Sequence, residues 1–157
     1  MNNLNRRKFI KGTVASSAVL AAAAAGLLTP VSAMAASWPK KAFSSKKVGQ
    51  VLNSLYGSDQ VIESKDVKIR APIQAENGSV VPFSVKTTIP NPEAITIMVT
   101  ANSMPLTANI KLPSAGGYFS ARIKMAKTSD VQVVVQSGGK LYSSKAKIKV
   151  TVGGCGG

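Results

Sequence analysis

The chain has 157 residues, a net charge of +14, one cysteine and no histidine. These counts argue against a Ser-His or Cys-His catalytic pair, an internal disulfide, and a zinc or iron–sulfur site built from this chain alone. The six acidic residues are scattered and no glycine-rich phosphate loop follows a predicted strand, so the chain makes a poor enzyme by itself.

Residues 1–35 are predicted to be an export signal rather than part of the fold. Arg6 and Arg7 form a twin-arginine motif typical of a Tat signal, and an alanine-rich apolar run follows them. The run is short for a membrane span, which needs about 20 apolar residues, although an N-terminal transmembrane anchor is the alternative. We expect cleavage after Ala35, a periplasmic location, and no membrane attachment after cleavage.

The mature chain, residues 36–157, then keeps 16 basic residues against six acidic ones, a net charge of +10. A basic exported domain favours acidic partners, anionic surfaces or small anions. Nucleic acid is not an expected partner, because the chain is exported and its few aromatic residues are not interleaved with a basic patch. Neither a metal nor a resident cofactor is expected.

The segment 36–57 is predicted to be a loose linker followed by the chain's one helix. Between Val48 and Leu55, apolar residues recur with the 3.6-residue period of a helix. Ser44 or Ser45 is the expected N-cap. Gly57 is the expected terminator. We expect this helix to pack on its own domain or across a subunit interface; a membrane-surface or partner helix is the alternative.

From residue 58 to residue 152, apolar and polar residues alternate, which predicts β-strands with one buried face each. Asn77-Gly78 indicates a turn between two of them. Half-buried strands of this kind pack as two antiparallel sheets, so the predicted fold class is all-β, an immunoglobulin-like antiparallel β-sandwich with one N-terminal helix. About seven strands are expected, centred on 67–69, 81–85, 95–99, 105–112, 119–125, 131–135 and 145–152.

The last predicted strand is expected to present an apolar face to the core and a row of lysines to solvent. Its residues divide as Ile148, Val150 and Val152 inward, and Lys145, Lys147 and Lys149 outward. A solvated lysine row discourages aggregation at a sheet edge. The alternative is that the row draws anions or acidic partners toward the residues that follow.

Residues 153–157 place Cys155 between two pairs of glycines. The four are Gly153, Gly154, Gly156 and Gly157. Because glycine has no Cβ, we expect a flexible swinging arm that can enter a narrow active-site channel. With Val152 as the last anchor, the sulfur would reach roughly 10 Å beyond the strand. The plainer alternative is a frayed terminus with an incidental cysteine.

Three stretches, together with the Tat signal, resemble the SoxY family of sulfur carriers: Ala71 to Gly78, Arg122 to Ala126, and Gly153 to Gly157. The last is the most specific. The resemblance implies that Cys155 is the covalent attachment site for thiosulfate and the sulfur intermediates derived from it. It also implies that no other cofactor is bound.

The resemblance implies a set of partners as well. A SoxZ-like β-sandwich subunit would form a heterodimer with the chain and be exported with it. A SoxAX-type cytochrome would load thiosulfate, a SoxB-type hydrolase would release sulfate, and a SoxCD-type sulfane dehydrogenase, where present, would oxidise the remaining sulfur. The chain would then carry the substrate covalently for other enzymes and would not be an enzyme itself.

Two other hypotheses follow from the residues alone. One is an exported structural or adhesive β-sandwich that forms an intermolecular disulfide through Cys155. The other is a thiol oxidoreductase that acts unaided, which the lack of a second cysteine and of histidine makes a poor fit. The predicted helix and an exposed sheet face are equally open candidates for a partner surface.

Overall fold

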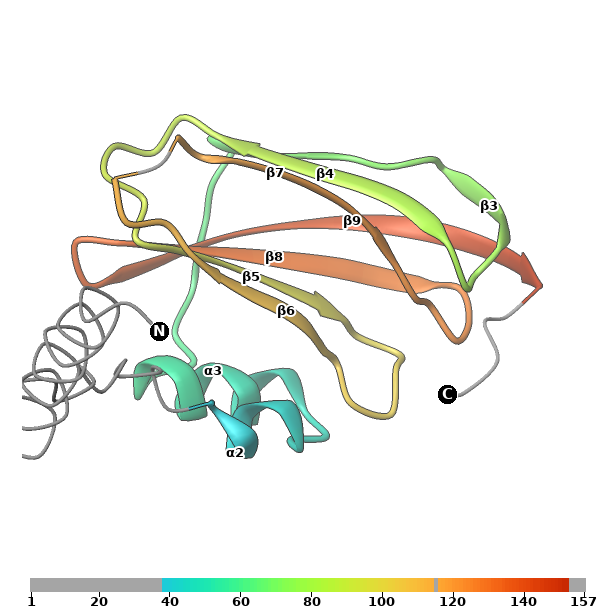
Figure 1. Cartoon of the computed structure of the whole chain (residues 1–157), viewed down its shortest axis with the longest axis horizontal. Helices are drawn as coiled ribbons and strands as arrows, with labels where there is room; N and C mark the ends of the chain where they lie inside the picture. Colours follow the sequence, from blue (N-terminus) through green and yellow to red (C-terminus); the bar gives the residue numbers. More distant parts are fainter. Residues whose placement is uncertain (1–37, 115, 153–157) are drawn as a thin grey trace, which may run out of the picture. The chain divides into compact units, whose positions relative to one another are not determined.

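The computed structural model of the protein describes residues 38–114 and 116–152. The chain divides into two compact units, Met1–Trp38 and Pro39–Gly157, and the described residues lie almost entirely in the second. The described part of that unit contains two helices and nine strands (Figure 1). They are α2 (Lys40–Phe43), α3 (Val48–Tyr56), β1 (Ile62–Glu63), β2 (Val67–Arg70), β3 (Gln74–Asn77), β4 (Val81–Thr87), β5 (Ala94–Val99), β6 (Leu106–Lys111), β7 (Tyr118–Ile123), β8 (Ser129–Ser137) and β9 (Lys140–Val152).

The strands form two sheets that pack face to face. The larger sheet has the order β1-β9-β8-β5-β6, with β3 also paired to β9, and the smaller sheet has the order β2-β4-β7. Their inner faces meet in one core, because alternate residues of each strand point inward. In β4, for example, Val81, Phe83 and Val85 are buried while Pro82 and Lys86 are exposed. The predicted all-β sandwich is confirmed.

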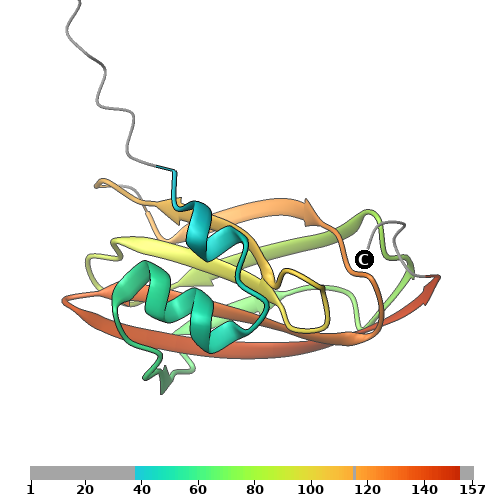
Figure 2. The same ribbon diagram turned by 90° about the horizontal axis from the view of Figure 1, so that it is seen from below.

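Both helices cover the outer face of the larger sheet, as Figure 2 shows from below. Their apolar side chains join those of the sheet in a second core, made of Ala42, Val51, Leu52, Met98, Leu106, Val134 and Leu141. All six residues of β5 are therefore buried, Thr96 and Met98 included. The expectation that every strand has a solvent-facing side is wrong for β5, because the helices shield its second face.

The helix prediction is right at its end and wrong at its start. Gly57 terminates α3 in the left-handed conformation at φ 73°, which glycine adopts without a Cβ penalty. The N-cap is Lys47, because the hydroxyls of Ser44 and Ser45 donate instead to the carbonyl of Lys41. These two serines thus close the short helix α2, which the sequence pattern did not predict.

Two strands escaped prediction, and both pair in parallel with β9. β1 has only two residues, and in the four residues of β3 only Ala75 is buried. Neither segment is long enough to display an alternating pattern. The sandwich is thus antiparallel except along one edge of β9. Asn77-Gly78 does form a turn, but there the chain passes from β3 in the larger sheet to β4 in the smaller one.

A partly buried cluster of polar side chains connects α3 to the larger sheet. The hydroxyl of Tyr56 lies 2.5 Å from Oγ1 of Thr96 on β5. The side-chain amide of Asn109 on β6 donates to both oxygens, at 3.3 Å and 3.1 Å. Burial raises the pKa of Tyr56, and the hydrogen bonds from Thr96 and Asn109 lower it by less. The tyrosine is therefore held in its neutral form beneath the helix.

Replacing this tyrosine, Tyr56→Phe, is expected to lower the free energy of unfolding at pH 7 by about 1 kcal/mol, because the hydrogen bonds to Thr96 and Asn109 are lost. The raised pKa adds stability that is present below the unfolded value of about 10 and is lost as pH rises through the folded value. The variant should therefore lose less stability than wild type above about pH 10. Urea unfolding across this range, with exposed Tyr118→Phe as control, tests it; parallel pH curves would contradict the prediction.

Candidate functional site

The residues predicted from the sequence to carry the chemistry lie outside the described residues: Cys155, Gly153, Gly154, Gly156 and Gly157, as well as Arg6 and Arg7 of the signal. The structure does describe the point from which residues 153–157 start. That point is the last part of β9, residues 149–152, which we call the arm base.

The arm base extends beyond the neighbouring strand of its own sheet. The pairing of β9 with β8 ends at Ile148, opposite Ser129. From there on, β3 supports one side of β9, with Ala75 opposite Val150 and Asn77 opposite Val152. The parallel strand that the sequence pattern did not reveal is therefore what holds the arm base in the sheet.

A threonine side chain supports the other side, where β8 is missing. The amide of Val150 donates to Oγ1 of Thr128 at 2.9 Å, and this hydroxyl in turn donates to the carbonyl of Val150 at 3.3 Å. Nearby, the hydroxyl of Thr151 donates to the carbonyl of Glu76 at 2.9 Å. These bonds take the place of ladder hydrogen bonds, so backbone groups of the arm base are paired on both sides.

Gly78 ties the end of β9 to the rest of the domain. Its amide donates to the carbonyl of Val152 at 2.8 Å, and its own carbonyl accepts from the amide of Met125 at 2.7 Å. Met125 follows β7 and is fully buried in the main core. The last described carbonyl of β9 is thus connected to the core through one glycine, which gives residues 153–157 a fixed starting point.

The side chain of Val152 does not point into the core as expected. Ile148 is fully buried and Val150 partly so, but Val152 is 66% exposed. The alternating pattern continues to Val152, while β9 has already passed the end of β8. Val80, which follows the Gly78 turn, is also 52% exposed. Backbone hydrogen bonds hold the end of β9 in place, while the side chains of Val80 and Val152 lie at the surface.

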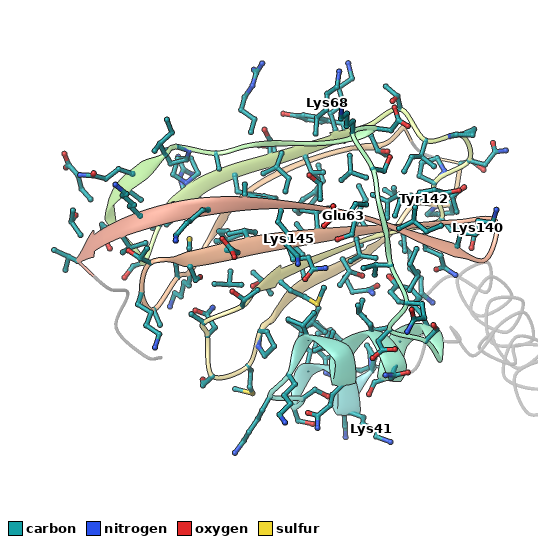
Figure 3. All side chains as sticks on the ribbon, turned by 180° about the vertical axis from the view of Figure 1, so that it is seen from behind. Lys41, Glu63, Lys68, Lys140, Tyr142 and Lys145 are labelled. Carbon is teal, nitrogen blue, oxygen red and sulfur yellow. The ribbon has the colours of Figure 1, made fainter. Side chains whose placement is uncertain are left out.

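The predicted lysine row does face solvent. Lys145, Lys147 and Lys149 are all exposed, and Figure 3 shows Lys145 on β9. Lys147 lies directly opposite Asp130 of β8, and Lys145 lies opposite Gln132. The charge of the row is therefore partly balanced by a carboxylate on the neighbouring strand.

In residues 38–114 and 116–152, no three His, Cys, Asp or Glu side chains gather in a way that could hold a metal ion. The helices of this part of the chain are also too short to cross a membrane.

A family model described as "Sulfur oxidation protein SoxY" matches residues 52–155, more than half of the chain, and this match includes both sheets and Cys155. The chain belongs to the SoxY family. A solved structure of the sulfur carrier protein SoxY from Chlorobium limicola f thiosulfatophilum is similar to this SoxY chain, with 41% sequence identity and a TM-score of 0.62. The likeness covers 68% of this chain and 97% of the other. None of the curated proteins matches the chain.

The family membership confirms the resemblance to SoxY that the sequence predicted. The roles predicted for Cys155 and its flanking glycines stay predictions. Sequence reasoning on this SoxY chain missed the supports of the arm base. Asn77-Gly78 was visible as a turn, but nothing in the sequence indicated that its amide would bind Val152. Thr128 carried no signal, because a threonine next to a strand is common in any β-protein.

Proposed function

We propose that this SoxY chain is a covalent sulfur carrier that holds thiosulfate, and the intermediates derived from it, on Sγ of Cys155. The observation that carries the proposal is the placement of the chain's one cysteine, inside the segment matched by the family model and three residues beyond the fixed arm base. Three residues give the sulfur roughly 10 Å of reach. The four flanking glycines add no side chains that would block a narrow channel.

The proposed chemistry leaves the catalytic groups to other proteins. The thiolate of Cys155 and the outer sulfur of thiosulfate form an S–S bond, and the two electrons released pass to a SoxAX-type cytochrome. Water then attacks the terminal sulfone in the active site of a SoxB-type hydrolase, releasing sulfate and leaving a persulfide on Cys155. Where a SoxCD-type dehydrogenase is present, that sulfane sulfur takes up oxygen from water and becomes a sulfonate, and its electrons pass to the dehydrogenase. The hydrolase afterwards removes this sulfonate as sulfate and restores the thiol of Cys155.

The same proposal places the chain in the periplasm, exported through its Tat signal as a heterodimer with a SoxZ-like β-sandwich subunit. The twin arginines Arg6 and Arg7 support export of a folded chain. In this arrangement the chain is a substrate of the enzymes that visit it and has no turnover of its own.

Intact-mass measurement on protein purified from thiosulfate-grown cells tests the carrier function. We expect adducts of sulfur or sulfur-oxyanion mass on the peptide that contains Cys155, released by a thiol reductant. Protein from cells grown without thiosulfate is the control and should carry little adduct. A thiol that is always unmodified, or a disulfide-linked dimer as the working form, would refute the proposal.

A further inference from the structure

The outer face of the smaller sheet carries only basic and neutral side chains. Its strands β2, β4 and β7 contain no acidic residue. Four exposed cations point outward from them, and we call these four the basic face: Lys68, Arg70, Lys86 and Arg122. They include both arginines found in the described part of the chain. Figure 3 shows Lys68 on the side of this sheet that faces away from β9.

The pairing of the strands brings like charges together on this face. Lys68 of β2 lies directly opposite Lys86 of β4. Like charges in this position destabilise a sheet. The acidic residue that precedes β2, Asp66, lies beyond these strands and is hydrogen-bonded to Thr88 and Ser64. A charge arrangement that costs stability, with no carboxylate among its strands, indicates that an anionic partner balances it.

A shallow hollow of about 670 Å³ lies on this face between the two arginines. Arg70 and Arg122 line it, together with Ser84, Ser120, Pro72 and Pro82. Ser84 is the neighbour of both Arg70 and Ser120 across the strands, so hydroxyls lie next to the guanidinium groups. Guanidinium groups bind carboxylates through two parallel hydrogen bonds. The hollow therefore offers matched donors for carboxylate side chains.

The spread of the charges distinguishes a protein surface from a small anion. Arg122 lies opposite Pro82, and Lys86 lies four residues farther along β4. At about 3.3 Å per residue, these cations are separated by roughly 13 Å along the strand. One small oxyanion cannot contact both ends of such a face, whereas several carboxylates on a protein surface can.

The arginine end of the basic face lies at the same end of the sandwich as the arm base. Arg122 is followed by buried Met125, whose amide donates to the carbonyl of Gly78. The amide of Gly78 donates in turn to the carbonyl of Val152. Two hydrogen bonds and a short piece of chain thus connect Arg122 to the residue from which the arm starts.

We propose that the basic face is a docking surface for an acidic patch on the enzymes that act on the Cys155 adduct. Binding there holds an enzyme beside the arm base while the arm enters its active site. The inference rests on the proposed carrier function and adds to it the surface and the chemistry by which the enzymes are recognised. Such contacts act mainly through the association rate and are weakened by salt.

The test measures binding of the mature chain, with its co-purifying subunit, to the SoxB-type hydrolase of the same organism. Surface plasmon resonance from about 0.1 M to about 1 M salt should show that wild-type affinity falls as the charges are screened. Arg70→Glu combined with Arg122→Glu should raise Kd at low salt by about tenfold or more and flatten the salt dependence. Arg70→Gln with Arg122→Gln should give an intermediate loss.

The matched control is Lys145→Glu with Lys147→Glu, which changes the net charge by the same amount on the larger sheet. It should change Kd by less than about threefold. An equal loss of affinity in both variants would mean that binding depends on net charge alone. Unchanged binding of the arginine variant would mean that the basic face is not a docking surface. Either result overturns the proposal. Loss of the co-purifying subunit from the arginine variant would also overturn it, by making the face a subunit interface.

Adduct mass on Cys155, measured in the same preparations, separates the two proposals. Normal adduct with unchanged binding of the arginine variant would refute the docking surface and leave the carrier function intact. A wild-type chain that never carries an adduct would refute the carrier function, whatever the binding measurements give.

Discussion

A Cys155→Ser variant is expected to lose sulfur carriage completely. The serine hydroxyl cannot form the S–S bond that attaches thiosulfate, and the chain has no second cysteine to replace the lost thiol. Cells that express only this variant should oxidise thiosulfate at the background rate, and intact-mass analysis should show no adduct. The thiolate is the species that attacks sulfur, and neither the serine nor the neighbouring glycines can supply one. We therefore expect no residual activity.

The variant also provides its own control for folding. Both described cores are built from residues that precede Cys155 in the chain, so the free energy of unfolding should change by less than about 0.5 kcal/mol. Binding to the SoxB-type hydrolase through the basic face should persist, although no product forms. Unimpaired thiosulfate oxidation by Cys155→Ser would show that the cysteine is incidental.

Deleting Gly153 and Gly154 together is expected to slow every enzyme step by about 100-fold while leaving the fold intact. The deletion shortens the arm by about 7 Å, most of the distance between the arm base and Cys155. Val152 cannot move outward to compensate, because Ala75, Asn77 and Gly78 hold the backbone of β9. Single-turnover rates of loading and of sulfate release, measured separately with each purified enzyme, test this.

A length-preserving variant separates reach from conformational freedom. Gly153→Ala with Gly154→Ala keeps the number of residues and restricts the backbone. We expect it to retain most of the rate at each step if reach is limiting. Unchanged rates after the deletion would mean that the enzymes bind the cysteine without needing the full arm.

The alternation of apolar and polar residues predicted the inner faces of the sandwich and could not predict its outer ones. Val81, Phe83 and Val85 are buried as expected, because alternation reports directly on the face that meets the core. In β5 the same alternation puts Met98 on the side away from the core, yet its side chain is buried against the helices. Alternation along a strand does not indicate whether a helix covers the second face of the sheet. The burial of Met98 could therefore not be predicted from the sequence pattern.

The candidate site also has a part that the sequence predicted and a part that it did not. Cys155 and its glycines stand out from composition alone, because a lone cysteine among glycines has few structural roles. The arm base depends on pairings between residues far apart in the chain, such as Thr128 with Val150 and Gly78 with Val152. Val152 was predicted to face the core because the alternation of apolar residues continues to it. At this position, however, β8 no longer lies beside β9. The basic face was equally hidden, since its cations come from three separate strands.

The support of β9 on both sides has a mechanical consequence. β9 pairs with antiparallel β8 along nine positions, through hydrogen bonds perpendicular to the strand, and beyond them with parallel β3, through hydrogen bonds that are slanted. A pull on the arm, as when an enzyme releases a bound cysteine, acts along β9 and loads these bonds together in shear. A strand pulled in this geometry resists as a unit, whereas one peeled from the sheet would open bond by bond. For the proposed carrier function, this means that the arm can be drawn into and out of successive active sites while β9 stays paired in its sheet.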